Sequence, residues 1–122
     1  MSKNYKAILK QEGHIISLQG KPFVTFKGLL WLAHKEGIED IATESLVDLN
    51  RVQETGLAIF KATVKGKHGT YTATGDASPK NVSKNIARHC IRMAETRAIC
   101  RALRLYLGAF IQMTALEEMG GD

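Results

Sequence analysis

The pattern of apolar and polar positions in the first third of the chain predicts a strand pair followed by a short helix. In residues 14–26 (HIISLQGKPFVTF), two β-rich runs flank a Gly-Lys step, which is typical of a hairpin or a sharp bend. Residues 27–37 (KGLLWLAHKEG) place leucines and an alanine at helical spacing and end at a glycine. We therefore expect two strands and then a helix of about three turns.

The next third predicts three more strands. Residues 41–49 (IATESLVDL) fit a strand by their β-branched content, and residues 51–56 (RVQETG) fit a turn. Two further runs, 57–67 (LAIFKATVKGK) and 70–75 (TYTATG), flank a His-Gly step that predicts a hairpin.

Two helix signals follow. Ser78-Pro79 combines an N-cap residue with a proline for the first helical position, so we expect a helix that runs to Leu107 and ends at Gly108. A last short helix is predicted in residues 114–121 (TALEEMGG), where a threonine and a glutamate have capping-box spacing.

The predicted order is β-β-α-β-β-β-α, and the predicted class is α+β, with an antiparallel meander sheet packed by one long helix. The length of 122 residues fits one domain, 1–122. Its core is expected at about residues 14–110, and residues 111–122 are expected to form the short C-terminal helix and tail.

The middle strand carries lysines on one face. Alternation places Lys61, Lys65 and Lys67 there, and the opposite, core-facing side receives Ala58, Phe60, Ala62 and Val64. Such lysines either follow a phosphate backbone or pair across strands with Glu44 and Asp48, at about 0.2–1 kcal/mol per pair. We favour pairing for Lys61 and Lys65, and backbone contact for Lys67 at the hairpin tip.

The long helix carries basic residues on two different sides. In its second half, an apolar stripe lies opposite three arginines: Arg97, Arg101 and Arg104. In its first half, the basic residues lie over the extension of that stripe: Lys84, Arg88 and Arg92. A straight helix on one core cannot satisfy both halves. We therefore expect a kink, or a first half that packs against something else, such as a neighbouring subunit.

The positive charge is uneven and changes residue type along the chain. Of the net charge of +5, residues 76–108 contribute seven positives and two negatives, whereas residues 109–122 contribute three negatives and no positive. All eleven lysines precede residue 88, and five of the six arginines lie in 88–104. A guanidinium binds phosphate bidentately and is weakly hydrated. An isoelectric point near 9.4 with clustered base indicates either a polyanionic partner, most simply nucleic acid, or a plain solvated face, and the charge alone favours neither. The choice of arginine favours phosphate or interface contact over the solvated face.

The sequence offers no catalytic or metal-binding constellation. The four histidines lack metal-ligand spacing, no nucleophile-base pairing is visible, and the P-loop spacing is missing. We therefore expect no enzyme, no metal and no cofactor. No apolar run reaches the 18 residues of a membrane span, and the N-terminus lacks the apolar core of a signal peptide. Reduced thiols in a cytoplasmic setting are the expectation for Cys90 and Cys100.

Residues 67–108 resemble the β-hairpin and long helix of the Rad-fifty-two-like single-strand annealing proteins, the recombination mediators of eukaryotes and their phage and bacterial relatives. The shared pattern is K-x-G-[ST]-Y and a glycine, followed by a helix that ends [KR]-A-L-R-x-[FY]-x-G. In this chain it falls on 67–71, Gly75 and 101–108. The short helix and the element order agree, and the likeness covers about residues 14–110.

The resemblance implies ATP-independent binding of single-stranded DNA and complementary-strand annealing in recombination and repair. Members of the family form oligomeric rings and hold the DNA backbone in a basic groove with the bases exposed. By position, Arg101 and Arg104 match DNA-contacting residues, Lys67 matches a basic residue of a second, outer strand site, and Arg92 matches another basic position.

Three positions depart from the family pattern. Gly28 stands where an arginine often begins the short helix, which leaves Lys27 as the nearest substitute. Cys100 stands where many relatives have lysine, and Arg97 stands where an acid is common.

The resemblance also implies partners and a location. The partners are single-stranded DNA, further copies of the chain in a homo-oligomeric ring, and a single-strand binding protein as a further candidate. No membrane is involved, and the location is cytoplasmic and nucleoid-associated. Two other functions remain open. One is a double-stranded RNA-binding module, since the segment from Leu29 gives α-β-β-β-α. The other is a ring-forming assembly protein whose arginines serve subunit contacts.

Overall fold

The computed structural model describes residues 5–78, 89–111 and 113–119, and here the chain folds as α+β. Its elements follow in this order: α1 (Tyr5–Gln11), β1 (Ile15–Leu18), β2 (Lys21–Val24), α2 (Phe26–Lys35), β3 (Ile38–Ser45), α3 (Leu49–Thr55), β4 (Ala58–Gly66), β5 (Gly69–Ala77), α4 (Cys90–Leu107) and the short 3₁₀ helices η2 (Gly108–Phe110) and η3 (Leu116–Met119).

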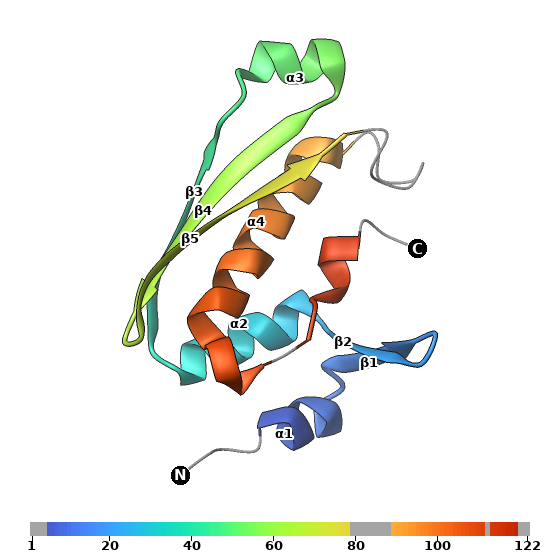
Figure 1. The fold of residues 1–122 in the computed structure, drawn as a ribbon, viewed down its shortest axis with the longest axis vertical. Coiled ribbons are helices and arrows are strands. Elements are labelled where there is room, and N and C mark those ends of the chain that lie inside the picture. The colour runs from blue at the N-terminus through green and yellow to red at the C-terminus, as the bar shows by residue number, and fades with distance from the viewer. Residues whose placement is uncertain (1–4, 79–88, 112, 120–122) are drawn as a thin grey trace.

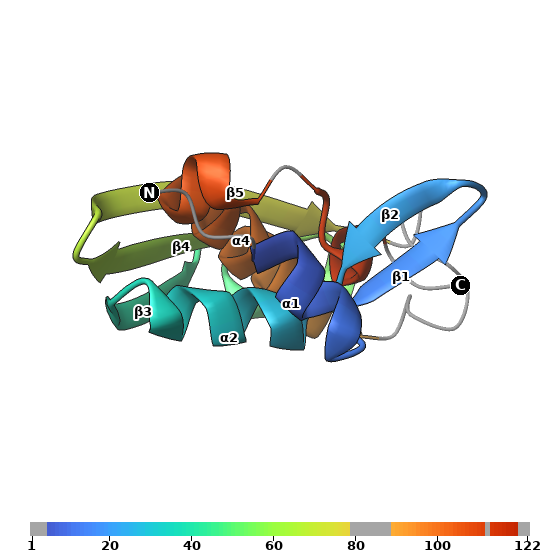
Figure 2. The ribbon, with the colours of Figure 1, turned by 90° about the horizontal axis from the view of Figure 1, so that it is seen from below.

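The strands form two separate antiparallel sheets. β1 and β2 make a hairpin, and β3, β4 and β5 make a three-stranded meander in that order. In Figure 1, α4 lies along one side of the meander, and the β1–β2 hairpin stands beyond α4, away from the meander. Figure 2 shows the same separation from below, with α2 and α4 between the two sheets. The outer side of the meander carries none of the described elements.

Local sequence explains the first elements. The β1–β2 turn places Gln19 at φ 52° and Gly20 at φ 80°, the left-handed pair that a two-residue hairpin turn requires. α2 begins at an N-cap, because the Thr25 hydroxyl accepts a hydrogen bond from the Gly28 N–H at 3.0 Å. The predicted hairpin and the predicted short helix are both confirmed.

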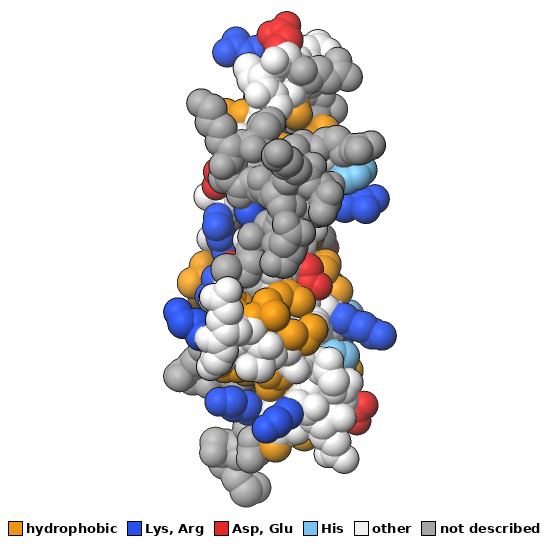
Figure 3. All heavy atoms as spheres, turned by 90° about the vertical axis from the view of Figure 1, so that its right-hand side faces the viewer, with side chains coloured by type: hydrophobic (Ala, Val, Ile, Leu, Met, Phe, Trp, Pro, Cys, Tyr) orange, Lys and Arg blue, Asp and Glu red, His pale blue; other side chains and the backbone are white. Residues whose placement is uncertain are grey.

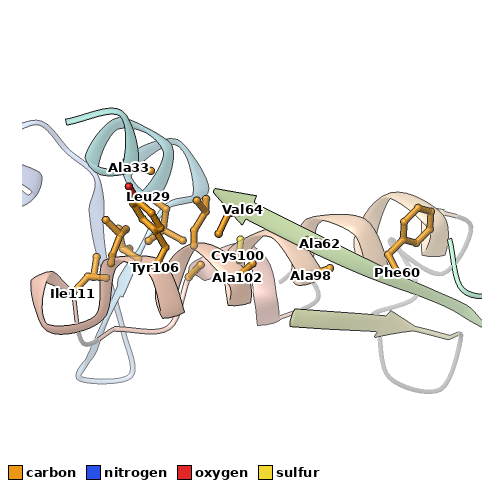
Figure 4. Close-up of a cluster of buried hydrophobic side chains, with 14 of the residues drawn as sticks. Leu29, Ala33, Phe60, Ala62, Val64, Ala98, Cys100, Ala102, Tyr106 and Ile111 are labelled. Carbon is orange, nitrogen blue, oxygen red and sulfur yellow. The ribbon is translucent and has the colours of Figure 1, made fainter. Parts of the chain in front are cut away.

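The alternation predicted for the middle strand is confirmed in β4. The side chains of Ala58, Ala62 and Val64 are fully buried, and Phe60 is nearly so. They face α4, which packs chiefly against β4 and β5 (Figure 4). The second hairpin is confirmed too, since Gly66 pairs with Gly69 across a two-residue turn.

The contact between α4 and the sheet is made by small side chains. A row at i, i+4 spacing is buried along the helix: Cys90, Ala94, Ala98, Ala102 and Tyr106. Opposite this row, β5 contributes Gly75, at which a Cβ atom would lie 2.3 Å from the Ala98 nitrogen and 2.5 Å from the Ala94 carbonyl oxygen. Only glycine fits there, because strand and helix backbones nearly touch.

This row also resolves the conflict between the two halves of the helix. An i, i+4 row is inclined to the helix axis, so it winds around the helix from one end to the other. A twisted sheet can follow such a row, and the apolar side of the helix then shifts along its length without a kink. In its described part α4 is one uninterrupted helix on one core, so residues 90–107 need no kink. The start of the predicted helix lies outside the described residues, and its packing against a neighbouring subunit stays a prediction.

Three elements differ from the prediction. Residues 51–56 were expected as a turn, but α3 covers most of them, with Asp48 as N-cap and Gly56 as a left-handed C-cap at φ 75°. The unpredicted α1 buries Tyr5 and Leu9, which are four residues apart on one side of the helix. β3 begins at Ile38, three residues before the predicted strand.

The C-terminal predictions are confirmed in outline. α4 ends at Leu107 before Gly108, and the short helix after residue 113 is the 3₁₀ helix η3. Glu117 was expected to form a capping box with Thr114. Its carboxylate instead accepts a hydrogen bond from the N–H of Phe26 in α2 at 2.7 Å. Ser78, the predicted N-cap, follows directly after β5, and Pro79 with residues 80–88 lies outside the described part of the chain.

Candidate nucleic-acid interface

Three arginines of α4 lie together beneath the C-terminal segment, residues 113–119, and we call them the arginine cluster: Arg97, Arg101 and Arg104. All three contact one residue of that segment, Glu118. Its carboxylate is 4% exposed, and it receives two hydrogen bonds from Arg104, at 2.8 Å from Nε and 2.7 Å from a terminal nitrogen. This is the bidentate geometry in which guanidinium binds carboxylate or phosphate.

Arg101 and Arg97 complete the arrangement. The Nε atom of Arg101 lies 3.7 Å from the Glu118 carboxylate, and a terminal nitrogen donates to the carbonyl oxygen of Thr74 at 3.0 Å. Arg97 donates to the carbonyl oxygens of Glu118 at 3.0 Å and of Asp76 at 2.7 Å. Two of these acceptors lie on β5, an edge strand, so the arginines also cover carbonyl groups of an exposed sheet edge.

The structure corrects the prediction for Arg97. Its position opposite the apolar stripe suggested an exposed groove, but the residue is only 6% exposed because η3 and the end of β5 cover it. Burial, followed by the neighbouring Arg101, lowers the pKa of Arg97 from its usual value. Arg97 therefore lies within the structure, whereas the side chains of Arg101 and Arg104 are 41% and 33% exposed.

The C-terminal segment is attached at several points. Glu118 accepts a hydrogen bond from the Ala115 N–H at 2.9 Å through the same carboxylate that binds Arg104. Ala115 pairs with Val24 in an isolated parallel bridge. Glu117, the next residue along, is bound to the first turn of α2. Adjacent carboxylates thus join the segment to two different helices.

The lysines of β4 lie on the other side of the molecule, on the outer face of the meander. The register places Lys61 between Glu44 and Thr74, and Lys65 between Asp40 and Thr70. Lys61 forms the expected cross-strand ion pair with Glu44 at 3.1 Å, and both side chains are largely exposed. We call Lys61 and Lys65 the lysine pair.

Asp48, the other acid expected to pair with these lysines, has a different role. Its carboxylate accepts a hydrogen bond from the Asn50 N–H at 2.8 Å and caps α3.

Lys67 lies at the tip of the β4–β5 hairpin, where several side chains fix the backbone. The Tyr106 hydroxyl accepts a hydrogen bond from the His68 N–H at 3.2 Å and donates one to the Glu36 carbonyl oxygen at 2.8 Å. The His68 ring nitrogen lies 2.9 Å from the buried Glu36 carboxylate, which also accepts a hydrogen bond from the Tyr5 hydroxyl. Lys67 itself is exposed, on a firmly held turn.

The remaining predicted residues are scattered. Lys27 is exposed in the first turn of α2, and Arg92 is exposed near the start of α4. A Cβ atom at Gly28 would lie 2.7 Å from the Cβ atom of His14, so a larger residue at this position would require His14 to shift. Lys84 and Arg88 lie outside the described residues.

Figure 3 shows one long face of the molecule. Lys and Arg side chains lie along both margins of this face, and apolar side chains gather between them in its lower half. Among the described residues, the predicted basic residues do not form one patch. The structure brings the three arginines of the cluster together beside β5, whereas Lys61 and Lys65 lie on the outer face of the meander with Thr63 between them.

Sequence reasoning missed the acidic partners of the basic residues. Glu118 and Glu36 are both buried, and each holds a basic residue that lies far away in the sequence, Arg104 or His68. One signal for Glu118 was present, because residues 109–122 hold acids and no base directly after an arginine-rich helix.

Cys90 and Cys100 are both buried, and neither is in a disulfide. Burial raises the pKa of the Cys90 thiol, and burial with the nearby carboxylates of Glu118 and Glu117 raises that of Cys100 strongly. Because the thiolate is the reactive form, both thiols are shielded from oxidants and alkylating agents in the folded chain.

Comparisons with protein-family models, with curated proteins and with solved structures gave no match to this chain. Within the described ranges, no group of three or more His, Cys, Asp or Glu side chains is arranged to hold a metal ion. None of the helices in that part of the chain is long and apolar enough to cross a membrane.

Proposed function

We propose that this chain binds single-stranded DNA by its backbone and anneals complementary strands without ATP, as an oligomeric ring. The observation that carries the proposal is the packing of the β4–β5 hairpin on α4. It brings together the two parts of the motif that resembles the single-strand annealing proteins, because the ring of Tyr71 meets that of Tyr106 edge-on at 6.0 Å. The Tyr106 hydroxyl also binds the hairpin tip at His68.

The chemistry of the arginine cluster supports a phosphate ligand. Arg104 already holds an oxyanion in bidentate form, and Arg101 lies beside the same oxyanion with 41% of its side chain exposed. A group of guanidiniums can bind the phosphate oxygens of a DNA backbone without contacting the bases, and such contacts do not depend on the DNA sequence. Lys67, on its fixed turn, is the candidate for a second contact away from the cluster.

The first test is the binding of fluorescently labelled oligo-dT at several salt concentrations. Each neutralised phosphate of a single strand adds about −0.7 to the slope of log K against log salt, so Arg101→Ala should make the slope shallower by about that amount. Arg51→Ala is the matched control, because it removes the same charge from an exposed position on α3. If Arg101→Ala binds like Arg51→Ala, Arg101 does not contact the strand.

The second test addresses assembly and annealing. Native mass measurement with and without oligo-dT reports the oligomer and the bound strand together, and mixing complementary oligonucleotides without nucleotide reports annealing. We expect a closed oligomer that binds the strand and accelerates pairing. A stable oligomer with no strand bound at physiological salt would favour the assembly-protein function instead.

Duplex RNA binding is the second candidate, since the order α2–β3–β4–β5–α4 contains the α-β-β-β-α arrangement with α3 inserted. Such modules recognise the shape of an A-form helix and its 2′-hydroxyls. Competition of unlabelled duplex RNA against labelled oligo-dT separates the candidates. A preference for duplex RNA at equal nucleotide concentration would overturn the single-strand proposal.

A further inference from the structure

We infer that Glu118 acts as an internal competitor for the arginine cluster, so that the C-terminal segment must leave the cluster before a phosphate backbone can bind there. The inference rests on the proposed function and adds to it a mode of regulation. In this inference the Glu118 carboxylate occupies the place that a phosphate would take on the arginines. Residues 113–119 hold this carboxylate there, and we call them the latch.

The geometry of the contact carries the first step. One carboxylate binds Arg104 through both oxygens, lies 3.7 Å from Arg101, and is itself almost completely buried. The two guanidiniums remain about one-third exposed, so solvent and ligands reach the arginines while the acid occupies the bonds that a phosphate would use. Phosphate and carboxylate match the guanidinium fork in the same way. The two ligands therefore exclude each other at Arg104.

The charge around the cluster carries the second step. Three guanidiniums contact Glu118, and the negative charge of Asp76 acts on Arg97 as well. The cluster therefore keeps an excess of positive charge while the latch is closed. A single strand brings several phosphates, whereas the latch brings one carboxylate to the arginines, so a strand that arrives along β5 can displace the latch.

The attachment of the latch carries the third step. η3 is four residues long, and the contacts of the latch to the rest of the chain include the bridge between Val24 and Ala115 and the bond from Phe26 to Glu117. The latch covers the side of α4 that carries the arginines. The row of α4 that packs on the sheet lies on a different side and faces Gly75. Opening of the latch thus leaves the packing of α4 on the meander in place.

The first experiment compares the unsubstituted chain with Glu118→Gln and Glu54→Gln in oligo-dT binding at fixed salt. Both variants remove one negative charge, but Glu118 contacts the arginines, whereas Glu54 is exposed on α3 and lies outside the latch. We expect Glu118→Gln to bind at least about tenfold more tightly, since hydrogen bonds to charged groups are among the stronger ones. We expect a much smaller change in Glu54→Gln. An equal change in both variants, or an unchanged affinity in a folded Glu118→Gln, overturns the inference.

The second experiment holds the latch closed, and it does not depend on the folding of Glu118→Gln. Bridged residues of neighbouring strands lie within the Cα separation that a disulfide spans, so Val24→Cys with Ala115→Cys should cross-link the latch. We expect the oxidised form to bind oligo-dT at least about tenfold more weakly, and full recovery on reduction. Ala115→Cys alone is the control. Equal binding by the oxidised and reduced forms overturns the inference.

Hydrogen exchange gives a direct view of the same event. The Ala115 N–H is bound to the Glu118 carboxylate in the closed latch, so oligo-dT should accelerate exchange in residues 113–119 and leave α4 protected. Slower exchange there on binding would contradict the inference. If no variant binds oligo-dT at any salt concentration, the proposed function fails and the inference with it. If binding depends on Arg101 but not on the latch, only the inference fails.

Discussion

The arginine cluster and the lysine pair are both basic, yet the chain uses them in different ways. Each guanidinium of the cluster is fixed by carbonyl or carboxylate oxygens of other elements, and Arg97 is buried among them. Lys61 has one exposed ion pair on the outer sheet face, and Lys65 is exposed beside it. The difference explains why the three positions of the cluster in α4 carry arginine and not lysine. A fixed, partly desolvated position with several acceptors requires the planar guanidinium of arginine, which donates several hydrogen bonds at set angles. An open sheet face accepts the ammonium of lysine, which acts as a point charge.

The largest expected effect concerns the most buried member of the cluster. Arg97→Met should lower the free energy of unfolding by about 3 kcal/mol, because it leaves the carbonyl oxygens of Asp76 and Glu118 without this donor. Arg92→Met, an exposed arginine on the same helix, should change stability by less than about 0.5 kcal/mol. Urea unfolding of both variants measures the difference. Similar losses in the two would mean that the buried position gives Arg97 no special part in stability.

Reciprocal swaps should have an intermediate effect. Arg104→Lys should cost about 1–2 kcal/mol, since one ammonium cannot replace both hydrogen bonds to Glu118. Lys61→Arg should change stability by less than about 0.5 kcal/mol, because its partner Glu44 is exposed. Thermal or urea unfolding checks both. If the two swaps cost the same, the choice of cation in the cluster has no structural basis.

The smallest effects should appear in the salt dependence of the two ion pairs. A double-mutant cycle between Lys61 and Glu44 should give a coupling of about 0.2–1 kcal/mol at low salt that largely disappears in 1 M salt. The cycle between Arg104 and Glu118 should give a larger coupling that persists, because the carboxylate is 4% exposed. A coupling at Arg104 that falls as steeply as that of the exposed pair would place Glu118 in contact with water.

Much of the fold could be predicted from the sequence because its signals are local. Alternation in β4, the two-residue turns and the Thr25 cap each depend on residues a few positions apart. α3 could have been predicted in the same way, since Asp48 and Gly56 are ordinary capping residues at its ends. The turn assignment gave too little weight to those two positions.

The site was harder to predict because its contacts are distant in sequence. The position of Arg97 on the helix is what the sequence indicated, but the segment that covers it contacts Arg97 through Glu118, 21 residues later. The winding of the buried row around α4 depends on the twist of the meander and on the glycine at position 75. A helical-wheel projection of the sequence contains neither the sheet twist nor the contact at Gly75. It therefore predicted that Arg97 lies in an open groove.

The small residues between α4 and β5 have a consequence for conformational entropy. Alanine and glycine have no rotamers to lose, so the contact of Ala94 and Ala98 with Gly75 forms without the side-chain entropy cost of a leucine-rich interface. The same property leaves no adjustable side chains in that layer. The helix backbone that carries the arginines is therefore held at a fixed distance from the edge of β5. A ligand that binds these arginines does not have to order the helix and the strand first.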